Sequence, residues 1–256
     1  MHKKIRQLEA IIEKENLKVI SVDVFDTLLL RSSRPELQRF KDFSKAQHTA
    51  FPIERIEGYL GLYKARLTSG KVQFDKACKL KGLYEVTYTN WLKGMSGSEF
   101  CCSNLEGEMI QKYLDIELEI EKNMLVPQRE LWAFLRRQSS LGLKVVLCSD
   151  MYLDANSIRI LIRKIMEDDL SYCLYVSSEW QKTKRDGTLF LAMLEDLNLA
   201  PQELLHVGDN FISDVQVPKT LDIHTLYFPR SAVWKALHLL RKKAYKFYLS
   251  KIAKLL

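Results

Sequence analysis

The order of apolar and polar residues predicts alternating strands and helices over most of the chain. Five short runs, rich in β-branched residues and leucine, are typical of strands in a parallel sheet, because helices cover both faces of such strands. The runs are VISVDVF at 19–25, LKVVLCSD at 143–150, CLYVSSE at 173–179, ELLHVGDN at 203–210 and DIHTLYF at 222–228.

Helical patterns lie between these runs. Residues 4–16 carry aliphatic side chains at helical spacing, and Pro127 marks the start of a second helix that ends before Gly142. Further helices are expected at 155–167 and 187–197. The alternation predicts βαβ units, and therefore an α/β fold with a Rossmann-like parallel sheet and helices on both faces.

A long stretch of mixed polarity interrupts this rhythm after the first strand. Residues 35–122 show helical spacing but no clear strand pattern. We therefore expect a mainly helical cap domain at 33–123, inserted into a core made of 1–32 and 124–230. Residues 231–256 are expected to form a basic, amphipathic C-terminal helix.

Composition places the chain among globular proteins. Of its 256 residues 47% are apolar, which is enough for a sizeable core and argues against disorder. Five cysteines, with no CxxC or Cys/His spacing, favour reduced thiols over disulfides or a zinc site. No signal-like apolar segment begins the chain, so a cytoplasmic protein is expected.

The net charge of +7 belongs to one part of the chain. No acidic residue follows Asp222, whereas eight cations do: Arg230, Lys235, Arg241, Lys242, Lys243, Lys246, Lys251 and Lys254. Without them the counts are 31 basic (39 − 8) and 32 acidic residues, so the remainder is close to neutral.

The basic C-terminal helix has more than one interpretation. A helix of this kind binds an anionic membrane surface, here the inner face of the membrane, or docks on a protein partner. Its first half could instead pack on the sheet as a terminal helix. Nucleic acid is not an expected partner, because no known binding motif accompanies the charge.

Polar residues gather directly after the predicted strands, where the carboxyl ends of parallel strands converge and ligands bind. They are Asp23, Asp26 and Thr27 after the first strand, and Ser149 and Asp150 after the second. Ser177, Ser178, Glu179, Lys182 and Lys184 follow the third, and Gly208, Asp209, Asn210, Ser213 and Asp214 the fourth. Converging carboxylates with a hydroxyl and a lysine suit Mg²⁺-assisted phosphoryl chemistry.

Four segments, DVFDTLLL, VVLCSD, KRDGTLF and HVGDNFISD, resemble in order and spacing the four motifs of the haloacid dehalogenase-like (HAD) hydrolase superfamily. The resemblance covers 18–31 and about 125–228. The residues of these segments are most similar to those of a bacterial branch associated with polysaccharide assembly and glycosyltransferases. A glycosyltransferase is therefore the expected kind of protein partner.

The resemblance implies a role for each matching residue. Asp23 would be the nucleophile and a Mg²⁺ ligand, together with the backbone carbonyl of Phe25 and the side chains of Asp209 and Asp214. Ser149, Asp150 and Lys184 would bind the phosphate, and Ser149 and Lys184 would also act in catalysis. Asp26, Thr27 and Asn210 would support the site.

The chain departs from the family pattern at one position. Phosphatases of this superfamily carry an acid/base Asp two residues after the nucleophile, where this chain has Phe25 and places Asp26 one residue later. Because successive side chains of an extended strand point to opposite faces, Asp26 is not expected to replace it. Dehalogenases of the superfamily place an aromatic residue there, but the retained Asp209 and Asp214 favour phosphoryl chemistry.

Each candidate residue also has a structural interpretation. Lys182 competes with Lys184 for the phosphate role, although the spacing to Gly187 favours Lys184. Asp209 and Asp214 could be helix caps instead of metal ligands. His206 and Cys148 lie within apolar strands and are expected in the core. Arg31 and Arg66 could meet a second anionic group of the substrate.

The expected function is a Mg²⁺-dependent phosphatase acting on a small phosphorylated metabolite, with a sugar phosphate or phosphorylated glycan intermediate as the implied substrate. Two alternatives remain open. One is a non-catalytic or slow subunit of a polysaccharide-assembly complex, and the other is a dehalogenase.

Overall fold

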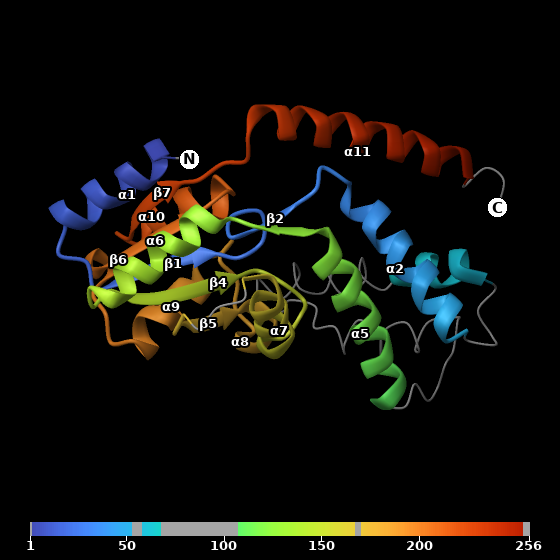
Figure 1. The fold of residues 1–256 in the computed structure, drawn as a ribbon, viewed down its shortest axis with the longest axis horizontal. Coiled ribbons are helices and arrows are strands. Elements are labelled where there is room, and N and C mark those ends of the chain that lie inside the picture. The colour runs from blue at the N-terminus through green and yellow to red at the C-terminus, as the bar shows by residue number, and fades with distance from the viewer. Residues whose placement is uncertain (1, 53–57, 68–106, 167–169, 253–256) are drawn as a thin grey trace. The chain divides into compact units, whose positions relative to one another are not determined.

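A computed structural model describes residues 2–52, 58–67, 107–166 and 170–252 of the chain (Figure 1). The described residues divide into two compact units. The first contains 2–30 and 125–229, and the second contains 31–52, 58–67, 107–124 and 230–252. Of the predicted cap at 33–123, residues 53–57 and 68–106 lie outside the described residues, as do 253–256 of the predicted C-terminal helix.

The first unit is built on a parallel sheet of five strands in the order β5-β4-β1-β6-β7. The five strands are β1 (Val19–Asp23), β4 (Lys144–Ser149), β5 (Cys173–Val176), β6 (Leu204–Gly208) and β7 (His224–Tyr227). Each lies within one of the five predicted runs, so the predicted α/β fold with a parallel sheet is confirmed. The central strand β1 pairs with β4 on one side and β6 on the other, which brings three of the polar strand ends together.

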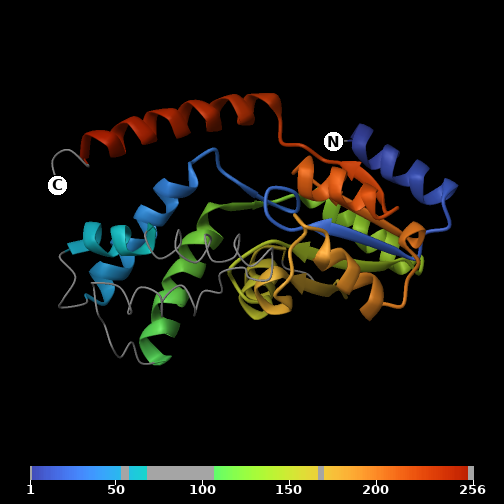
Figure 2. The same cartoon turned by 180° about the vertical axis from the view of Figure 1, so that it is seen from behind.

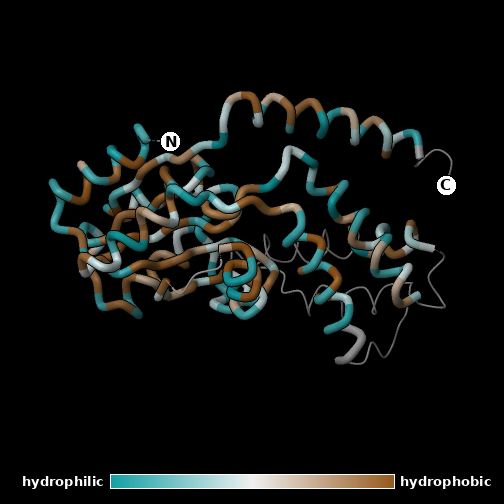
Figure 3. The backbone as a smooth tube through the Cα atoms, in the orientation of Figure 1, coloured by the Kyte–Doolittle hydropathy of each residue, from teal (hydrophilic) through white to brown (hydrophobic). Residues whose placement is uncertain are grey.

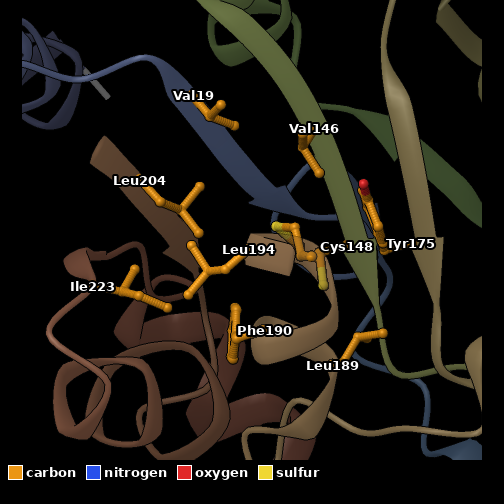
Figure 4. Packing of buried hydrophobic residues seen from close by; sticks show 10 residues of the cluster. Val19, Val146, Cys148, Tyr175, Leu189, Phe190, Leu194, Leu204 and Ile223 are labelled. Carbon is orange, nitrogen blue, oxygen red and sulfur yellow. The ribbon is translucent and has the colours of Figure 1, made fainter. Parts of the chain in front are cut away.

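Helices cover both faces of this sheet, because every residue of β1 and of β6 is buried. They include α1 (His2–Lys14), α6 (Arg129–Ser140), α7 (Ala155–Met166) and α9 (Thr188–Asp196), which Figures 1 and 2 show around the strands. On one face the side chains of α9 pack against those of β1, β4, β5 and β6 (Figure 4). The core there includes Val19, Val146, Leu189, Phe190 and Leu204.

A second, two-stranded sheet was not predicted. It pairs β2 (Leu29–Arg31) with β3 (Leu125–Pro127). The expectation that Pro127 begins a helix was wrong, because Pro127 ends β3 and α6 begins at Arg129. Strands of three residues are too short for a two-residue period to be visible in the sequence.

Shorter elements complete the first unit. The predicted strand at 173–179 ends at Val176, and α8 (Ser177–Trp180) follows it directly. A short helical turn, η1 (Pro201–Glu203), precedes β6. A π-helical turn, η2 (Ile212–Gln216), and α10 (Val217–Thr220) connect β6 to β7.

In the second unit, α2 (Glu36–Ala50), a helix at 58–67 and α5 (Gly107–Met124) are joined by buried ion pairs. Arg66 donates two hydrogen bonds of 2.9 Å to Glu117, and Arg39 donates one to Glu121. The guanidinium of Arg31 lies 3.7 Å from the same Glu121 carboxylate. Arg31 and Arg66, expected to meet a second anionic group of the substrate, are thus paired with glutamates of α5.

The C-terminal helix α11 (Ala232–Ile252) belongs to the second unit. Its residues contact the segment that leads into α2 and α2 itself: Trp234 donates a 3.0 Å hydrogen bond to the Arg31 carbonyl, and Lys41 donates one of 2.9 Å to the Tyr248 hydroxyl. Within the described ranges, none of the helices has the length and apolar character required to cross a bilayer.

Candidate active site

Asp23 is the last residue of the central strand β1, and this residue is 7% exposed at the carboxyl end of the sheet. The ammonium of Lys184 lies 2.5 Å from Oδ1 of Asp23, and the hydroxyl of Thr27 donates a 3.0 Å hydrogen bond to Oδ2. Both carboxylate oxygens therefore have a fixed partner. Thr27 is fully buried, so it holds Asp23 in one orientation.

Asp214 approaches from the π-helical turn η2. The same Lys184 ammonium lies 2.8 Å from its Oδ1, and the backbone N–H of Asn210 donates a 2.9 Å hydrogen bond to Oδ2. The side-chain oxygen of Asn210 accepts N–H groups of Ile212 and Ser213 and so shapes the start of the turn. A π-helical turn is a rare element that is often found at functional sites. Here it directs a buried carboxylate back toward the strand ends.

Gly208, the last residue of β6, leaves the space that Asp214 occupies. A Cβ atom at this position would lie 2.3 Å from both Cγ and Oδ2 of Asp214. No side chain larger than hydrogen fits there, so Gly208 belongs to the site, although its sequence position alone predicted no role for it. The available signal was a glycine at a strand end, next to a candidate metal ligand.

Lys184 is held by its backbone as well as by its side chain. Its N–H donates a 2.8 Å hydrogen bond to Oδ1 of Asp150, which follows β4. Lys184 is buried at 2% exposure, whereas Lys182 is partly exposed. The structure thus brings Lys184 to Asp23 and gives Asp150 a contact with the loop that carries this lysine. The predicted phosphate-binding role of Asp150 stays a prediction.

Three carboxylates, those of Asp23, Asp209 and Asp214, offer oxygen atoms that all lie within 4.8 Å of one another. When all three are ionised, their combined charge of −3 is offset by one ammonium, that of Lys184, which leaves an excess negative charge in a largely buried place. Carboxylate oxygens are ligands that Mg²⁺ prefers. The set therefore fits a divalent cation in charge and in donor type.

The pKa values of these groups reflect the crowding of charge. Burial raises the pKa of Asp23 to about 8; Lys184 opposes this shift, and the carboxylates of Asp214 and Asp209 add to it. Burial also acts to raise the pKa of Asp214, but Lys184 and His206 outweigh it and hold that pKa well below its usual range. The pKa of Lys184 is raised despite burial, because Asp23 and Asp214 both stabilise the ammonium.

Phe25 and Asp26 lie in the tight turn that follows β1. The Phe25 side chain is 7% exposed, and Asp26 has a φ of 68°, a left-handed conformation that aspartate tolerates better than most residues. The Asp26 N–H donates a 2.8 Å hydrogen bond to the Leu29 carbonyl, which closes the turn. Asp26 therefore shapes the loop around Asp23.

Ser149 ends β4 and is 1% exposed, beside the β1 strand end that carries Asp23. The polar residues after β5 fix the neighbouring loop. The Ser177 hydroxyl accepts the N–H of Met151 at 2.9 Å, and the Ser178 hydroxyl donates to the carbonyl of Leu153 at 2.8 Å. These serines support the loop after β4.

Comparison with known proteins gives structural relatives only. No family model matches the chain, and no curated protein matches it. Among solved structures, a HAD family enzyme from Bacteroides thetaiotaomicron, in complex with magnesium and inorganic phosphate, is 18% identical with a TM-score of 0.50, covering 84% of this chain and 96% of that one.

Two further solved structures agree in fold. A 2-haloacid dehalogenase from Pseudomonas syringae pv. Tomato is 12% identical with a TM-score of 0.55, and the match covers 83% of this chain and 86% of that one. A HAD phosphatase from Thermococcus onnurineus is 14% identical with a TM-score of 0.51, and the match covers 84% and 88%. This chain has the HAD-like fold.

His206 lies at the centre of this HAD-like core. Its side chain is fully buried in β6, with Nδ1 2.9 Å from the Ser21 hydroxyl and Nε2 3.4 Å from Oδ1 of Asp214. The ring also meets the edge of Phe190 at 4.8 Å between centroids. Burial lowers the pKa of His206, partly opposed by Asp214. His206 is therefore a core residue whose Nε2 also contacts the carboxylate of Asp214.

Proposed function

We propose that this protein is a Mg²⁺-dependent phosphatase that cleaves a small phosphorylated metabolite through an aspartyl-phosphate on Asp23. One observation carries the proposal: the Lys184 ammonium lies between the carboxylates of Asp23 and Asp214 at 2.5 and 2.8 Å, beside the third carboxylate, Asp209. Such an arrangement presents an oriented nucleophile next to the positive charge that a transferring phosphoryl group requires.

The proposed reaction has two displacements. A carboxylate oxygen of Asp23 forms a bond to phosphorus, the bond from phosphorus to the substrate oxygen breaks, and that oxygen leaves with the electron pair and takes a proton. A water molecule then attacks phosphorus and loses a proton. Inorganic phosphate leaves, and the Asp23 carboxylate is restored. Lys184 and the buried Ser149 hydroxyl would contact the phosphoryl oxygens in both steps.

The carboxylates of Asp23, Asp209 and Asp214, with the backbone carbonyl of Phe25, would hold Mg²⁺. When bound, the cation offsets the negative charge of the carboxylates and of the phosphate, which would otherwise repel one another. Thr27 and Gly208 act through geometry: Thr27 orients Asp23, and Gly208 admits Asp214.

Phe25 suggests which leaving groups suit the enzyme. A side chain placed to donate a proton contributes roughly 10²–10⁴-fold in such reactions. Phe25 stands where that acid is expected and cannot donate a proton. We therefore propose a preference for substrates whose leaving oxygen is stable as an anion, such as the anomeric oxygen of a sugar 1-phosphate. This class agrees with the sugar phosphate or glycan intermediate that the sequence resemblance implies.

A second candidate function is dehalogenation. The aromatic residue at position 25 favours it, and so does the fold similarity to a 2-haloacid dehalogenase. The Asp23 carboxylate would then attack carbon to form an ester, the halide would leave with the electron pair of the broken bond, and water would hydrolyse the ester to restore Asp23. The cluster of three carboxylates favours the phosphatase instead, because it fits a cation that this displacement does not require.

The test is phosphate release from a panel of sugar phosphates by the purified chain with Mg²⁺. We expect turnover that the Asp23→Asn variant loses, while the matched variant Asp222→Asn retains it. Asp222 is an exposed aspartate at a φ of 59°, which asparagine also tolerates. Chloride release from 2-haloacids without metal would instead show a dehalogenase. Absence of both reactions would favour the non-catalytic subunit.

A further inference from the structure

The helix α11 exposes a narrow apolar stripe. Val233, Leu237, Leu240, Ala244 and Phe247 follow one another at steps of four, three, four and three residues. At 100° per residue they fall within an arc of about 80° on one side of the helix. Val233, Leu237, Leu240 and Phe247 are 70, 43, 63 and 63% exposed. Figure 3 shows hydrophobic and hydrophilic residues alternating along this helix.

The stripe is not the side by which α11 packs in its own unit. That side carries Trp234, His238 and Tyr245, all partly buried, and lies about 120° from the stripe. Trp234 stacks on His238 with ring centroids 4.9 Å apart and bonds to the Arg31 carbonyl. Among the described residues of the second unit, the apolar stripe therefore takes no part in the packing of α11.

The charge of α11 indicates what kind of surface the stripe binds. The helix carries Lys235, Arg241, Lys242, Lys243, Lys246 and Lys251 and no acidic residue. At 100° per residue Arg241 and Lys243 lie about 80° to either side of the stripe's centre and Lys251 lies in line with it, whereas Lys235, Lys242 and Lys246 lie on the opposite side of the helix. Two copies paired through the stripe would bring like charges together. A surface that complements this helix has an apolar interior beneath a negatively charged outer layer.

A groove opens beside the stripe. It has a volume of about 460 Å³ and is lined by Arg34, Gln38, Arg241, Ala244, Tyr245 and Tyr248. Ala244 belongs to both the groove and the stripe. The Arg241 guanidinium donates a 2.6 Å hydrogen bond to Ser33, and Arg34 pairs with Asp42 at 2.6 Å, so both guanidinium groups are fixed at the groove. Guanidinium groups match the geometry of phosphate oxygens.

We propose that α11 binds the surface of an anionic phospholipid bilayer. The stripe enters the headgroup region, Lys243 and Lys251 contact lipid phosphates, and the groove at Arg34 and Arg241 accepts one headgroup phosphate. This inference does not depend on the catalytic role of Asp23, since it rests on residues of the second unit.

The first test is flotation of the full chain with vesicles of phosphatidylcholine alone or mixed with phosphatidylglycerol. Binding is expected only with phosphatidylglycerol and should weaken as salt is added, because salt screens the lysines. Equal recovery with both vesicle types, or no recovery with either, would overturn the proposal.

The second test compares two substitutions that add the same charge to the same helix. Leu240→Asp alters the stripe, whereas Leu239→Asp alters a residue of similar exposure, 53%, about a third of a turn from its centre. Leu240→Asp should lower the vesicle partition coefficient by at least about tenfold, which is the loss of one buried leucine side chain. Leu239→Asp should have a much smaller effect, and equal losses would show that only net charge matters.

The third test examines the cations. Lys243→Gln should lower the partition coefficient by about fivefold, as expected for one cation near an anionic surface. Circular dichroism of each variant should match the parent chain. Sedimentation without vesicles tests for other partners of the stripe. A dimer that Leu240→Asp dissociates would show that the stripe binds a second copy of the chain. Stripe-dependent binding to an acidic protein, without vesicle binding, would show a protein partner instead of a membrane.

Discussion

The ammonium of Lys184 lies 2.5 Å from the carboxylate of Asp23, although 161 positions separate the two residues in the chain. The parallel sheet explains this proximity. Asp23 is the last residue of β1. Lys184 lies after β5, in the loop that leads into α9, and the side chains of α9 pack against one face of the sheet, including residues of β1. The fold thus converts two distant residues into one ion pair, and Asp214 shares the same lysine.

Lys184→Met should remove the positive charge that two buried carboxylates share. We expect kcat for phosphate release to fall by about 10²–10³-fold, the usual loss when one group that stabilises transition-state charge is removed. Lys182→Met is the matched control, because Lys182 is partly exposed, and should leave kcat nearly unchanged. Steady-state kinetics on both variants would refute the assignment if Lys182→Met were the more damaging change.

Gly208→Ala should displace Asp214, because the new methyl group would meet its carboxylate at 2.3 Å. We expect loss of Mg²⁺ binding by calorimetry, together with loss of phosphate release. Gly142→Ala is the control: it meets no atom within 4 Å but has a φ of 96°, so it costs only backbone strain of about 1–2 kcal/mol. A Gly208→Ala protein that binds Mg²⁺ as the parent does would show that Asp214 is not a ligand.

The affinity for Mg²⁺ should depend on pH through Asp23. Its pKa is raised to about 8, so below that pH the carboxyl group holds a proton that the cation must displace. Affinity should rise by about tenfold per pH unit up to about pH 8 and then level off, with proton release on binding. Calorimetry in buffers of different ionisation enthalpy measures this release. Affinity independent of pH between 6 and 8 would contradict the assignment.

Phe25→Asp should make the enzyme less selective for good leaving groups. The parent chain is expected to hydrolyse aryl phosphates much faster than alkyl phosphates, because the leaving alkoxide receives no proton from position 25. An aspartate there should raise the alkyl rate by up to about 10²-fold relative to the aryl rate. The ratio is informative even if the variant is less stable, since both rates come from the same preparation. An unchanged ratio would indicate another proton donor.

The sequence predicted the five strands of the parallel sheet because a buried parallel strand leaves a continuous apolar run. The polar residues that follow four of these strands were also expected at one edge of the sheet, because βαβ units make the strands parallel and bring their carboxyl ends to the same edge. The β2–β3 pair was not predicted, because a strand of three residues is too short to show an alternation of apolar and polar residues. The π-helical turn at Ile212–Gln216 was missed as well, since it is stabilised by the side-chain contacts of Asn210 within the turn and by the distant contact of Asp214 with Lys184.

The role of Gly208 could not be read from the chain for a related reason. A glycine at a strand end has several explanations, and only the position of Asp214 shows which one applies. The burial of Lys184 likewise follows from the packing of the loop before α9, where the Asp150 carboxylate holds its N–H. Sequence spacing could favour Lys184 over Lys182 but could not place its ammonium between two carboxylates.

The central claim is that Asp23 accepts a phosphoryl group, and a phosphoryl mimic tests it most directly. Fluorine NMR of the full chain with beryllium fluoride and Mg²⁺ should show a bound trifluoroberyllate resonance in the parent chain and in Asp222→Asn, but none in Asp23→Asn. Absence of the resonance in the parent chain, or its persistence in Asp23→Asn, would contradict the account.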